Sequence, residues 1–235
     1  MVKEKTFRNV IVNVVIAVLV SAAAITGIVL NGNAVSANES APLYRGTSDT
    51  KVSLMINVYW GTEYIEPMLD VLRDKGVKTT FFVGGMWVAE NESLLRKIYN
   101  DGHEIGNHGY YHKDHKKLSD ERCREEIDIT HKLVSKVIGV EMNLFAPPSG
   151  AYNSNTVSVA EKLGYRTIMW SLDTIDWRDK NTETIYVRAT KKVAGGDLIL
   201  MHPTVNTLEA LPRIIDTIKE KGLTVAPVTE VLDNL

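Results

Sequence analysis

Beyond residue 50, short apolar runs alternate with longer segments whose apolar residues recur with a helical period. The runs have the length of buried strands, and they predict seven strands, at 52–58, 78–83, 104–105, 143–146, 166–170, 197–201 and 223–226. The amphipathic segments between them predict helices near 63–75, 93–100, 120–138, 154–163, 182–193 and 208–221. A glycine stands at or just past the end of five of these helices, where a helix commonly stops: Gly76, Gly102, Gly139, Gly164 and Gly222.

This alternation of strands and helices is typical of a parallel α/β fold, and the number of strands favours a β/α barrel. Residues 51–235 are enough to form it as one domain with its own core. In such folds the reactive side chains gather at the C-terminal ends of the strands. The residues that follow each predicted strand are therefore the candidates for a functional site.

The N-terminal segment has a different pattern. Three basic residues among the first eight precede residues 10–30, which contain no charged side chain. This stretch is long enough to cross a membrane as a helix, which takes about 20 residues, and its basic flank predicts that the remaining chain lies outside the cytoplasm. A cleaved signal peptide is the alternative, since the small residues up to Ala37 suit cleavage there. We therefore expect 1–37 to be a membrane anchor or signal segment, followed by a polar linker at 38–50.

Composition excludes some partners and some chemistry. The chain carries 27 basic and 29 acidic residues, a formal net charge of −2, without a long run of either sign. Neither nucleic acid nor an acidic polymer is therefore expected as a partner. Cys123 is the only cysteine, so no disulfide can form within the chain, and its polar surroundings in a predicted helix argue against a nucleophile.

Two histidines, His108 and His112, stand four residues apart just after a predicted strand. Imidazoles at this spacing can hold one divalent ion, and zinc and other first-row metals suit them. Later strand ends add two carboxylates, Asp173 and Asp176, and a third imidazole, His202. The other histidines are expected at solvated or helix-surface positions: His103, His115 and His131.

These motifs, in this order, resemble the NodB-homology polysaccharide deacetylases, which are carbohydrate esterases of family 4, and the resemblance covers residues 51–235. It implies an irregular seven-stranded β/α barrel, here preceded by the N-terminal membrane helix. It also implies a hydrolase that cleaves the acetamide C–N bond of N-acetylated cell-envelope glycans. In that family a divalent metal, with zinc as the expected ion, polarises the acetamide and its bound water, while an aspartate acts as base and a histidine as acid.

The histidine positions carry the family's residues. The resemblance makes His108 and His112 metal ligands. It makes His202 the general acid, with Asp176 as the hydrogen-bond partner that tunes its basicity.

The resemblance also assigns residues that would bind the glycan. Trp177 would form a wall of the substrate groove, and Leu200 would line the acetyl pocket. Further residues at strand ends are expected to contact the sugar rings: Tyr59, Trp60, Pro148 and Tyr152.

The first motif departs from the family. The pattern Thr-Phe-Asp-Asp-Gly falls on residues 55–59, which are Met-Ile-Asn-Val-Tyr. Asn57 stands at the position of the catalytic base, although an amide accepts no proton near neutral pH, and Val58 stands at that of the third metal ligand. In a later motif Ala146 replaces the arginine that steadies the base. This change is consistent with Asn57, because an arginine without a carboxylate partner would be an unpaired buried charge, which is destabilising. Losing a general base typically lowers a rate about 10²–10⁴-fold, and two histidines are fewer ligands than protein zinc sites normally use.

Two main hypotheses of function follow. The chain is a metal-dependent N-deacetylase that works with an altered base, or a pseudoenzyme that keeps the barrel as an anchored glycan-binding or interaction domain. A different amide hydrolase on the same fold is a third hypothesis, because amide substrates share one reacting centre. The family context favours a bacterial envelope or sporulation protein outside the cytoplasm, whose partner is a peptidoglycan-like or chitin-like glycan.

Overall fold

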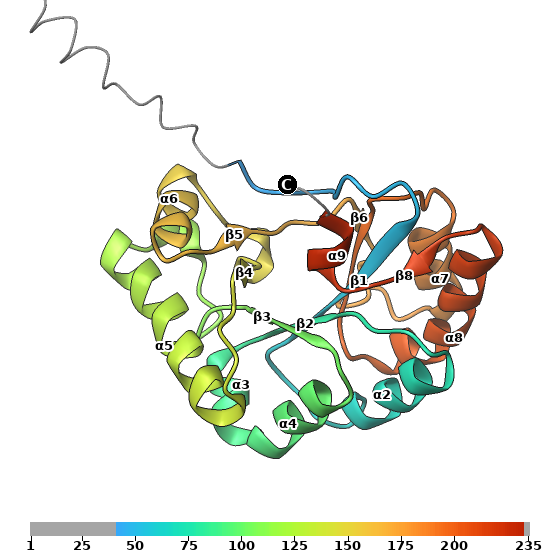
Figure 1. Ribbon diagram of the computed structural model, residues 1–235, viewed down its shortest axis with the longest axis horizontal. Helices are drawn as coiled ribbons and strands as arrows, with labels where there is room; N and C mark the ends of the chain where they lie inside the picture. The colour runs from blue at the N-terminus through green and yellow to red at the C-terminus, as the bar shows by residue number, and fades with distance from the viewer. Residues whose placement is uncertain (1–40, 233–235) are drawn as a thin grey trace, which may run out of the picture. The chain divides into compact units, whose positions relative to one another are not determined.

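One sheet of parallel strands forms the centre of the folded domain (Figure 1). The computed structural model describes residues 41–232. Within them, strands pair in the order β5-β4-β3-β2-β1-β7-β6, with β8 beside β1. Their bounds are β1 Lys51–Val58, β2 Thr80–Val83, β3 Glu104–Asn107, β4 Leu144–Phe145, β5 Arg166–Thr167, β6 Leu172–Asp173, β7 Leu198–Met201 and β8 Thr224–Val225.

The predicted parallel α/β architecture is confirmed, since every strand pair runs parallel. The sheet has two ends, β5 and β6, so the strands form an α/β half-barrel where the sequence predicted a seven-stranded barrel. The described residues contain eight strands, and the one that was not predicted is β6. With only 2 residues, β6 is too short for the alternation that identifies a strand.

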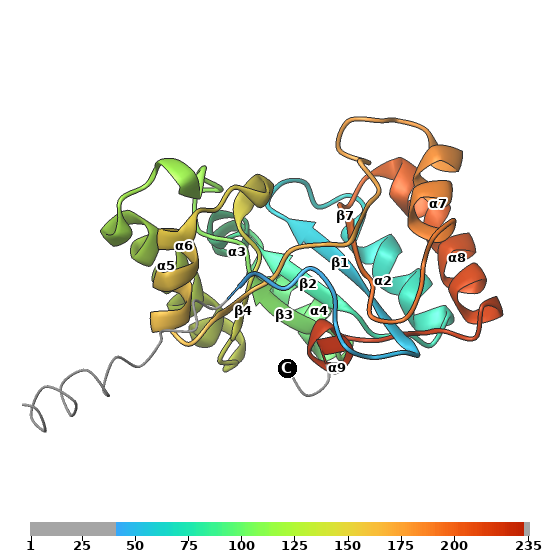
Figure 2. The ribbon, with the colours of Figure 1, turned by 90° about the horizontal axis from the view of Figure 1, so that it is seen from above.

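All the predicted helices are present, and they surround the sheet. Figures 1 and 2 show α5 and α6 at one end of the sheet and α7 and α8 at the other. Two further helices, α3 and α9, are too short to show a helical period in the sequence. The bounds are α2 Ile65–Asp74, α3 Gly85–Glu90, α4 Glu92–Asn100, α5 Asp120–Ile138, α6 Ser154–Lys162, α7 Thr182–Thr190, α8 Val205–Glu220 and α9 Val228–Leu232, with 3₁₀ turns at His115–Lys117 and Pro148–Gly150.

The ends of α5 show how local sequence sets these elements. The side chain of Ser119 accepts a hydrogen bond from the backbone N–H of Arg122 and caps the first turn. Gly139 ends the helix with φ of 73°, a conformation that side chains disfavour. The other predicted helix-stop glycines also have positive φ, which confirms the signal.

The side chains of β1 alternate between two cores. Leu54, Ile56 and Val58 belong to the larger one, which the surrounding helices complete. Met55 belongs to the smaller one, to which α9 contributes. Asn57 follows Met55 on the same face, at the C-terminal end of the strand. The face of β1 that carries Met55 is therefore apolar near α9 and polar at the C-terminal end of the strand, where a functional site is expected.

The segment before β1 packs on the domain and does not form the predicted linker. Leu43 bridges to the chain beyond β5, and Arg45 bridges to Asp197 just before β7. Arg45 also forms an ion pair with Asp197 at 2.7 Å. Gly46 leaves no room for a side chain, because a Cβ there would lie 2.0 Å from the carbonyl oxygen of Val231. The linker prediction is therefore wrong for residues 41–50, whose polar groups make contacts within the fold.

The predicted membrane segment at 10–30 and the cleavage position near Ala37 lie outside the described residues. Within residues 41–232, no helix combines the length and the apolar character that crossing a membrane requires.

Candidate functional site

A cavity of about 390 Å³ lies at the C-terminal ends of the central strands. Its volume falls within the range of small-ligand sites. The cavity brings together many of the predicted site residues, as the strand-end rule expects. It is lined by Asn57, Tyr59, Trp60, His108, His112, Ser149, Gly150, Trp170, Asp173, Trp177, Leu200 and His202.

The two predicted metal-binding histidines lie together in this cavity. The ring centroids of His108 and His112 are 5.0 Å apart. The Nδ1–H of His108 donates to the carbonyl oxygen of Ala146 at 2.7 Å, which leaves Nε2 as the atom with a free lone pair. Burial lowers the pKa of His108 well below its usual value and that of His112 to about 4. Both imidazoles are therefore neutral near pH 7, the state that binds a metal ion.

Helix α5 holds the loop that carries His112. The carboxylate of Glu126 accepts hydrogen bonds from the backbone N–H groups of Tyr110 and Tyr111, at 2.9 and 2.7 Å. His112 itself has φ of 54°, an unfavourable conformation for a residue with a side chain. Since Glu126 is buried, this anchor fixes the loop.

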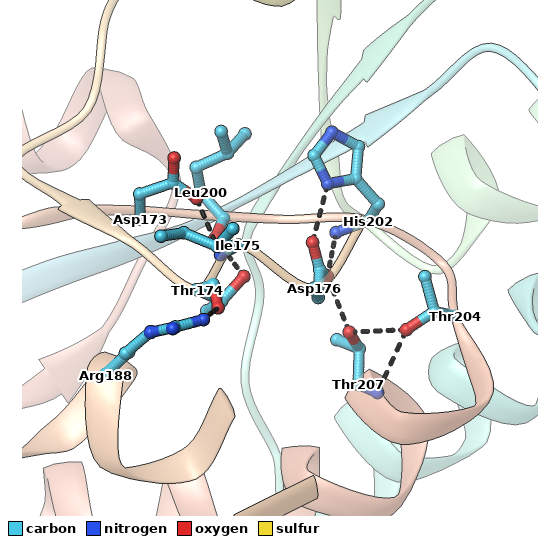
Figure 3. A network of polar contacts seen from close by, with 9 residues as sticks. All are labelled: Asp173, Thr174, Ile175, Asp176, Arg188, Leu200, His202, Thr204 and Thr207. Atoms are coloured by element: carbon cyan, nitrogen blue, oxygen red, sulfur yellow. Dashed lines mark hydrogen bonds and ion pairs between the residues drawn. The ribbon is translucent and has the colours of Figure 1, made fainter. Parts of the chain in front are cut away.

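His202 is oriented by a buried carboxylate. Figure 3 shows Asp176 between His202 and Thr207. The Nδ1–H of His202 donates to Asp176 at 2.8 Å, and the backbone N–H of His202 and the hydroxyl of Thr207 both donate to the other carboxylate oxygen at 2.6 Å. The predicted Asp176–His202 pair is therefore formed, with Asp176 behind the histidine and outside the cavity lining. This arrangement leaves Nε2 of His202 as the ring atom that can exchange a proton with a ligand.

The three positions that depart from the family motifs carry no acidic side chain. Asn57 lines the cavity, and its buried Oδ1 has no hydrogen-bond partner among the described residues. Val58 is fully buried within the larger apolar core. Ala146 is buried in the smaller core and contributes only its carbonyl oxygen, which binds His108.

The residues present do not fit a zinc centre. In residues 41–232, no three His, Cys, Asp or Glu side chains are placed to hold one metal ion. Protein zinc sites normally use three or four such ligands. His108 and His112 are thus two donors without a third, because Val58 has no ligand atom and Asn57 has only an amide.

Aromatic rings cover the open side of the histidines. Tyr59 stacks on His112 with ring centroids 3.5 Å apart and an interplanar angle of 14°. Trp60 stacks on His202 at 5.4 Å. Trp177 stands at the rim of the cavity with 57% of its surface exposed, as the predicted groove wall requires.

Two predicted glycan-binding residues lie elsewhere. The hydroxyl of Tyr152 forms a hydrogen bond of 2.7 Å with that of Tyr44, and Tyr152 is absent from the cavity lining. Pro148 is buried in its 3₁₀ turn and does not line the cavity either. Neither residue lines this cavity, because the turn directs Ser149 and Gly150 toward it instead, and their contacts with sugar rings stay a prediction.

Several cavity residues were not predicted. Trp170 ends the predicted strand 166–170, so the strand-end rule applied to it would have found it. Asp173 was expected among the strand-end carboxylates but was given no role; it lines the cavity, and burial raises the pKa of its carboxyl group. Ser149 adopts φ of 55°, which no feature of the sequence signals.

The expectation that the remaining histidines are solvated is wrong for two of them. His103 is buried, and its Nδ1 accepts a hydrogen bond from the backbone N–H of Thr79 at 3.2 Å. His115 is fully buried, and neither ring nitrogen has a hydrogen-bond partner among residues 41–232. His131 is partly exposed and lies between the hydroxyl of Tyr165 and the carboxylate of Glu141.

Comparison with known sequences relates the chain to a family of hydrolases. The model of the polysaccharide deacetylase family matches residues 44–168. The uncharacterized protein YlxY of Bacillus subtilis is 44% identical over 193 residues, which are 82% of this chain and 60% of that protein, so the chain spans less than two-thirds of that relative's length. A peptidoglycan-N-acetylglucosamine deacetylase of Bacillus cereus is 34% identical over 175 residues, 72% of this chain and 82% of that one.

The similar solved structures include a pseudoenzyme. The crystal structure of a CE4 family pseudoenzyme from Bacillus anthracis matches with a TM-score of 0.80 and 39% identity, covering 83% of this chain and 69% of that one. A mutant of that pseudoenzyme with restored enzymatic activity matches with a TM-score of 0.80 and 37% identity, covering 83% and 72%.

Proposed function

Because the chain belongs to the polysaccharide deacetylase family, we propose that its domain binds an N-acetylated glycan and does not hydrolyse it. One observation carries the proposal. The family motif has two aspartates where this chain has the amide of Asn57 in the cavity and the side chain of Val58 in the apolar core. The chain has therefore kept the family's cavity without the groups that would drive hydrolysis there.

Hydrolysis is lost on two separate grounds. Asn57 cannot take a proton from water, and the absence of a general base typically costs about 10²–10⁴-fold in rate. His108 and His112 form no three-ligand metal site with any other described residue. Each loss is large, and together they remove both ways of making a nucleophile from water.

Binding is favoured by the backbone that the site has kept. The described non-glycine residues with positive φ are His112, Ser149 and Ile175, and all three lie in loops at the C-terminal edge of the sheet. Each such conformation costs about 1–3 kcal/mol, and such strain clusters at ligand sites. Trp177, exposed at the rim, offers a ring face on which a sugar can stack. The strained backbone at this edge therefore supports a ligand-binding role for the cavity.

The class of ligand follows from the relatives. They include a peptidoglycan-N-acetylglucosamine deacetylase and a pseudoenzyme of the same family. The cavity offers a small apolar wall at Leu200 and a polar group at Asn57, which together suit an acetamide. The proposed ligand is therefore a peptidoglycan-like N-acetylated glycan.

The proposed location is outside the cytoplasm, in the bacterial envelope. The basic residues before the apolar stretch 10–30 support an anchor that leaves the domain on the outer side. Release after cleavage near Ala37 would place the same domain in the same compartment.

A metal-dependent deacetylase with an altered base is the second candidate, and the intact Asp176–His202 pair favours it. Two measurements distinguish the candidates: binding of N-acetylglucosamine oligosaccharides and peptidoglycan by the full chain, and release of acetate from them, both with added zinc. We expect the glycan to bind, the variant Trp177→Ala to bind it more weakly, and the release of acetate not to exceed that of His202→Ala. Tyr99→Ala is the matched control, because Tyr99 is an exposed aromatic residue that does not line the cavity. Acetate release above the His202→Ala level would overturn the proposal in favour of the second candidate.

A further inference from the structure

A second cavity, of about 550 Å³, adjoins the first on the other side of the Tyr59–His112 stack. The two cavities share Tyr59, Trp60 and His112 in their linings. The second is bounded further by Gly61, Thr62, Met86, Trp87, Glu90, Asn91, Tyr110 and Tyr111, none of which lines the first. A ligand that leaves the first cavity over the Tyr59 ring therefore enters a second concave surface.

The walls of the second cavity are held in place by the fold. The backbone N–H of Met86 in α3 donates to the carbonyl oxygen of Tyr110 at 3.1 Å, which joins the helix to the loop after β3. The indole N–H of Trp87, also in α3, donates to the carbonyl oxygen of Gly61 at 2.7 Å, which joins the helix to the loop after β1. A Cβ at Gly85 would lie 2.2 Å from the ring of Tyr110, so glycine allows this close packing. The cavity is thus formed before any ligand binds.

Exposed apolar side chains gather at this cavity. Among the described residues, the large apolar side chains that are exposed include Tyr59, Trp60, Met86 and Tyr111, and all four line it. Tyr111 has 49% of its surface exposed. Soluble proteins seldom group exposed apolar side chains in this way unless the surface binds something. Aromatic faces and a flexible thioether suit the flat apolar face of a sugar ring.

Polar groups at the edge complete the arrangement. The carboxylate of Glu90 is exposed and forms no hydrogen bond or ion pair within residues 41–232. Thr62 adds a hydroxyl beside it. A mainly apolar concave surface with a few polar acceptors is the usual composition of a small-ligand site. Sugar hydroxyls are the donors that such acceptors would bind.

We infer that the second cavity is a saccharide subsite, which binds the sugar next to the one whose acetamide lies in the first cavity. The inference rests on the proposed function, because it takes the glycan of that function as its ligand. Tyr59 is the wall between the two subsites, and it stands where the family motif has a glycine. This subsite is therefore shaped by a residue that departs from the family motif, and it makes the domain a binder of glycan chains more than of single sugars.

Titration calorimetry on the full chain tests the inference with N-acetylglucosamine and with its disaccharide. We expect the disaccharide to bind about tenfold more tightly than the monosaccharide. Tyr111→Ala should abolish this difference and leave the affinity for the monosaccharide unchanged. Tyr111→Phe, which keeps the ring, and Tyr99→Ala, an exposed tyrosine outside both cavities, should both retain the difference.

The outcomes separate this inference from the proposed function. Monosaccharide binding without a gain for the disaccharide, or a gain that Tyr111→Ala keeps, would overturn the subsite alone. Failure of the full chain to bind either sugar would overturn the subsite and the proposed function together. Tyr111 lies on the surface, and its backbone N–H keeps its bond to Glu126 in every variant, so the fold is preserved.

Discussion

The ring of Tyr59 lies face to face with the imidazole of His112, with centroids 3.5 Å apart. The family motif has glycine at this position, and a glycine has no ring that could cover this face of the histidine. The stack therefore adds a third change to those at Asn57 and Val58, and it acts on a histidine that is itself unchanged. Both residues line both cavities, so the stack belongs at once to the proposed non-hydrolytic site and to the proposed second subsite.

Restoring the motif should restore chemistry. We expect Asn57→Asp, Val58→Asp and Ala146→Arg together to release acetate from N-acetylated oligosaccharides in the presence of zinc, because they supply a base, a third ligand and the partner of the base. Adding Tyr59→Gly should raise the rate further by uncovering His112. The measurement is acetate release by the triple and quadruple variants. The triple variant with His202→Ala is the control, and equal rates with and without Tyr59→Gly would contradict a role for the stack.

Val58→Asp alone should destabilise the protein. Val58 is fully buried in the larger core, and an unpaired carboxylate there is expected to lower the free energy of unfolding by about 3 kcal/mol. Zinc should reverse part of this loss, because His108, His112 and the new carboxylate would make three ligands. Urea unfolding with and without zinc measures both effects. Val58→Thr is the control of matched shape, and a zinc effect as large in that control would refute this explanation.

Thr207→Val should loosen the support of His202. The hydroxyl of Thr207 donates to the buried carboxylate of Asp176 at 2.6 Å, so its removal is expected to cost about 1–3 kcal/mol. Chemical unfolding gives the stability, and acetate release in the restored triple variant shows whether His202 is still held correctly. Thr207→Ser keeps the donor and should behave like the parent. A loss of stability without a loss of rate would show that Asp176 positions His202 without Thr207.

Buried histidines should make stability depend on pH. Burial holds the pKa of His103 and of His115 at about 4, against an ordinary value of 6.5. The unfolded chain binds protons at these rings below about pH 6.5, whereas the folded chain does so only below about pH 4. The free energy of unfolding should therefore be constant above about pH 6.5 from this source and fall as the pH is lowered toward 4.

Urea unfolding between pH 7.5 and 4.5 would measure this slope. His115→Leu should make the slope shallower, because it removes one of the two rings whose pKa burial lowers. The variant loses no hydrogen bond of the ring, since neither ring nitrogen has a partner among residues 41–232. An unchanged slope in that variant would mean that His115 is already charged in the folded protein.

Much of the fold was predictable because long periodic segments leave a clear signal. Helix α5 begins and ends at the predicted residues, where Ser119 caps it and Gly139 stops it. By contrast, α3, α9 and β6 are too short for a period to repeat often enough to be recognised, and their positions depend on tertiary packing. Within residues 41–50 the predicted linker was wrong, because polar residues there form bonds with the domain in place of bonds with water.

The site was predictable as far as strand ends determine it. His108, His112, Asn57 and His202 meet in one cavity, as their positions after the strands required. The burial of Val58 in the larger core, away from Asn57, emerged only from the structure. The stack of Tyr59 on His112 was not predictable, since it depends on loop conformations that include φ of 54° at His112.

The central claim is that the domain binds an N-acetylated glycan and leaves it intact. Proton NMR of one sample tests it most directly, with the full chain, zinc and an N-acetylglucosamine oligosaccharide together and the acetyl methyl signals followed over time. The account predicts that these signals shift or broaden as the glycan binds, while free acetate stays at the level of His202→Ala. Free acetate that accumulates above that level would contradict it.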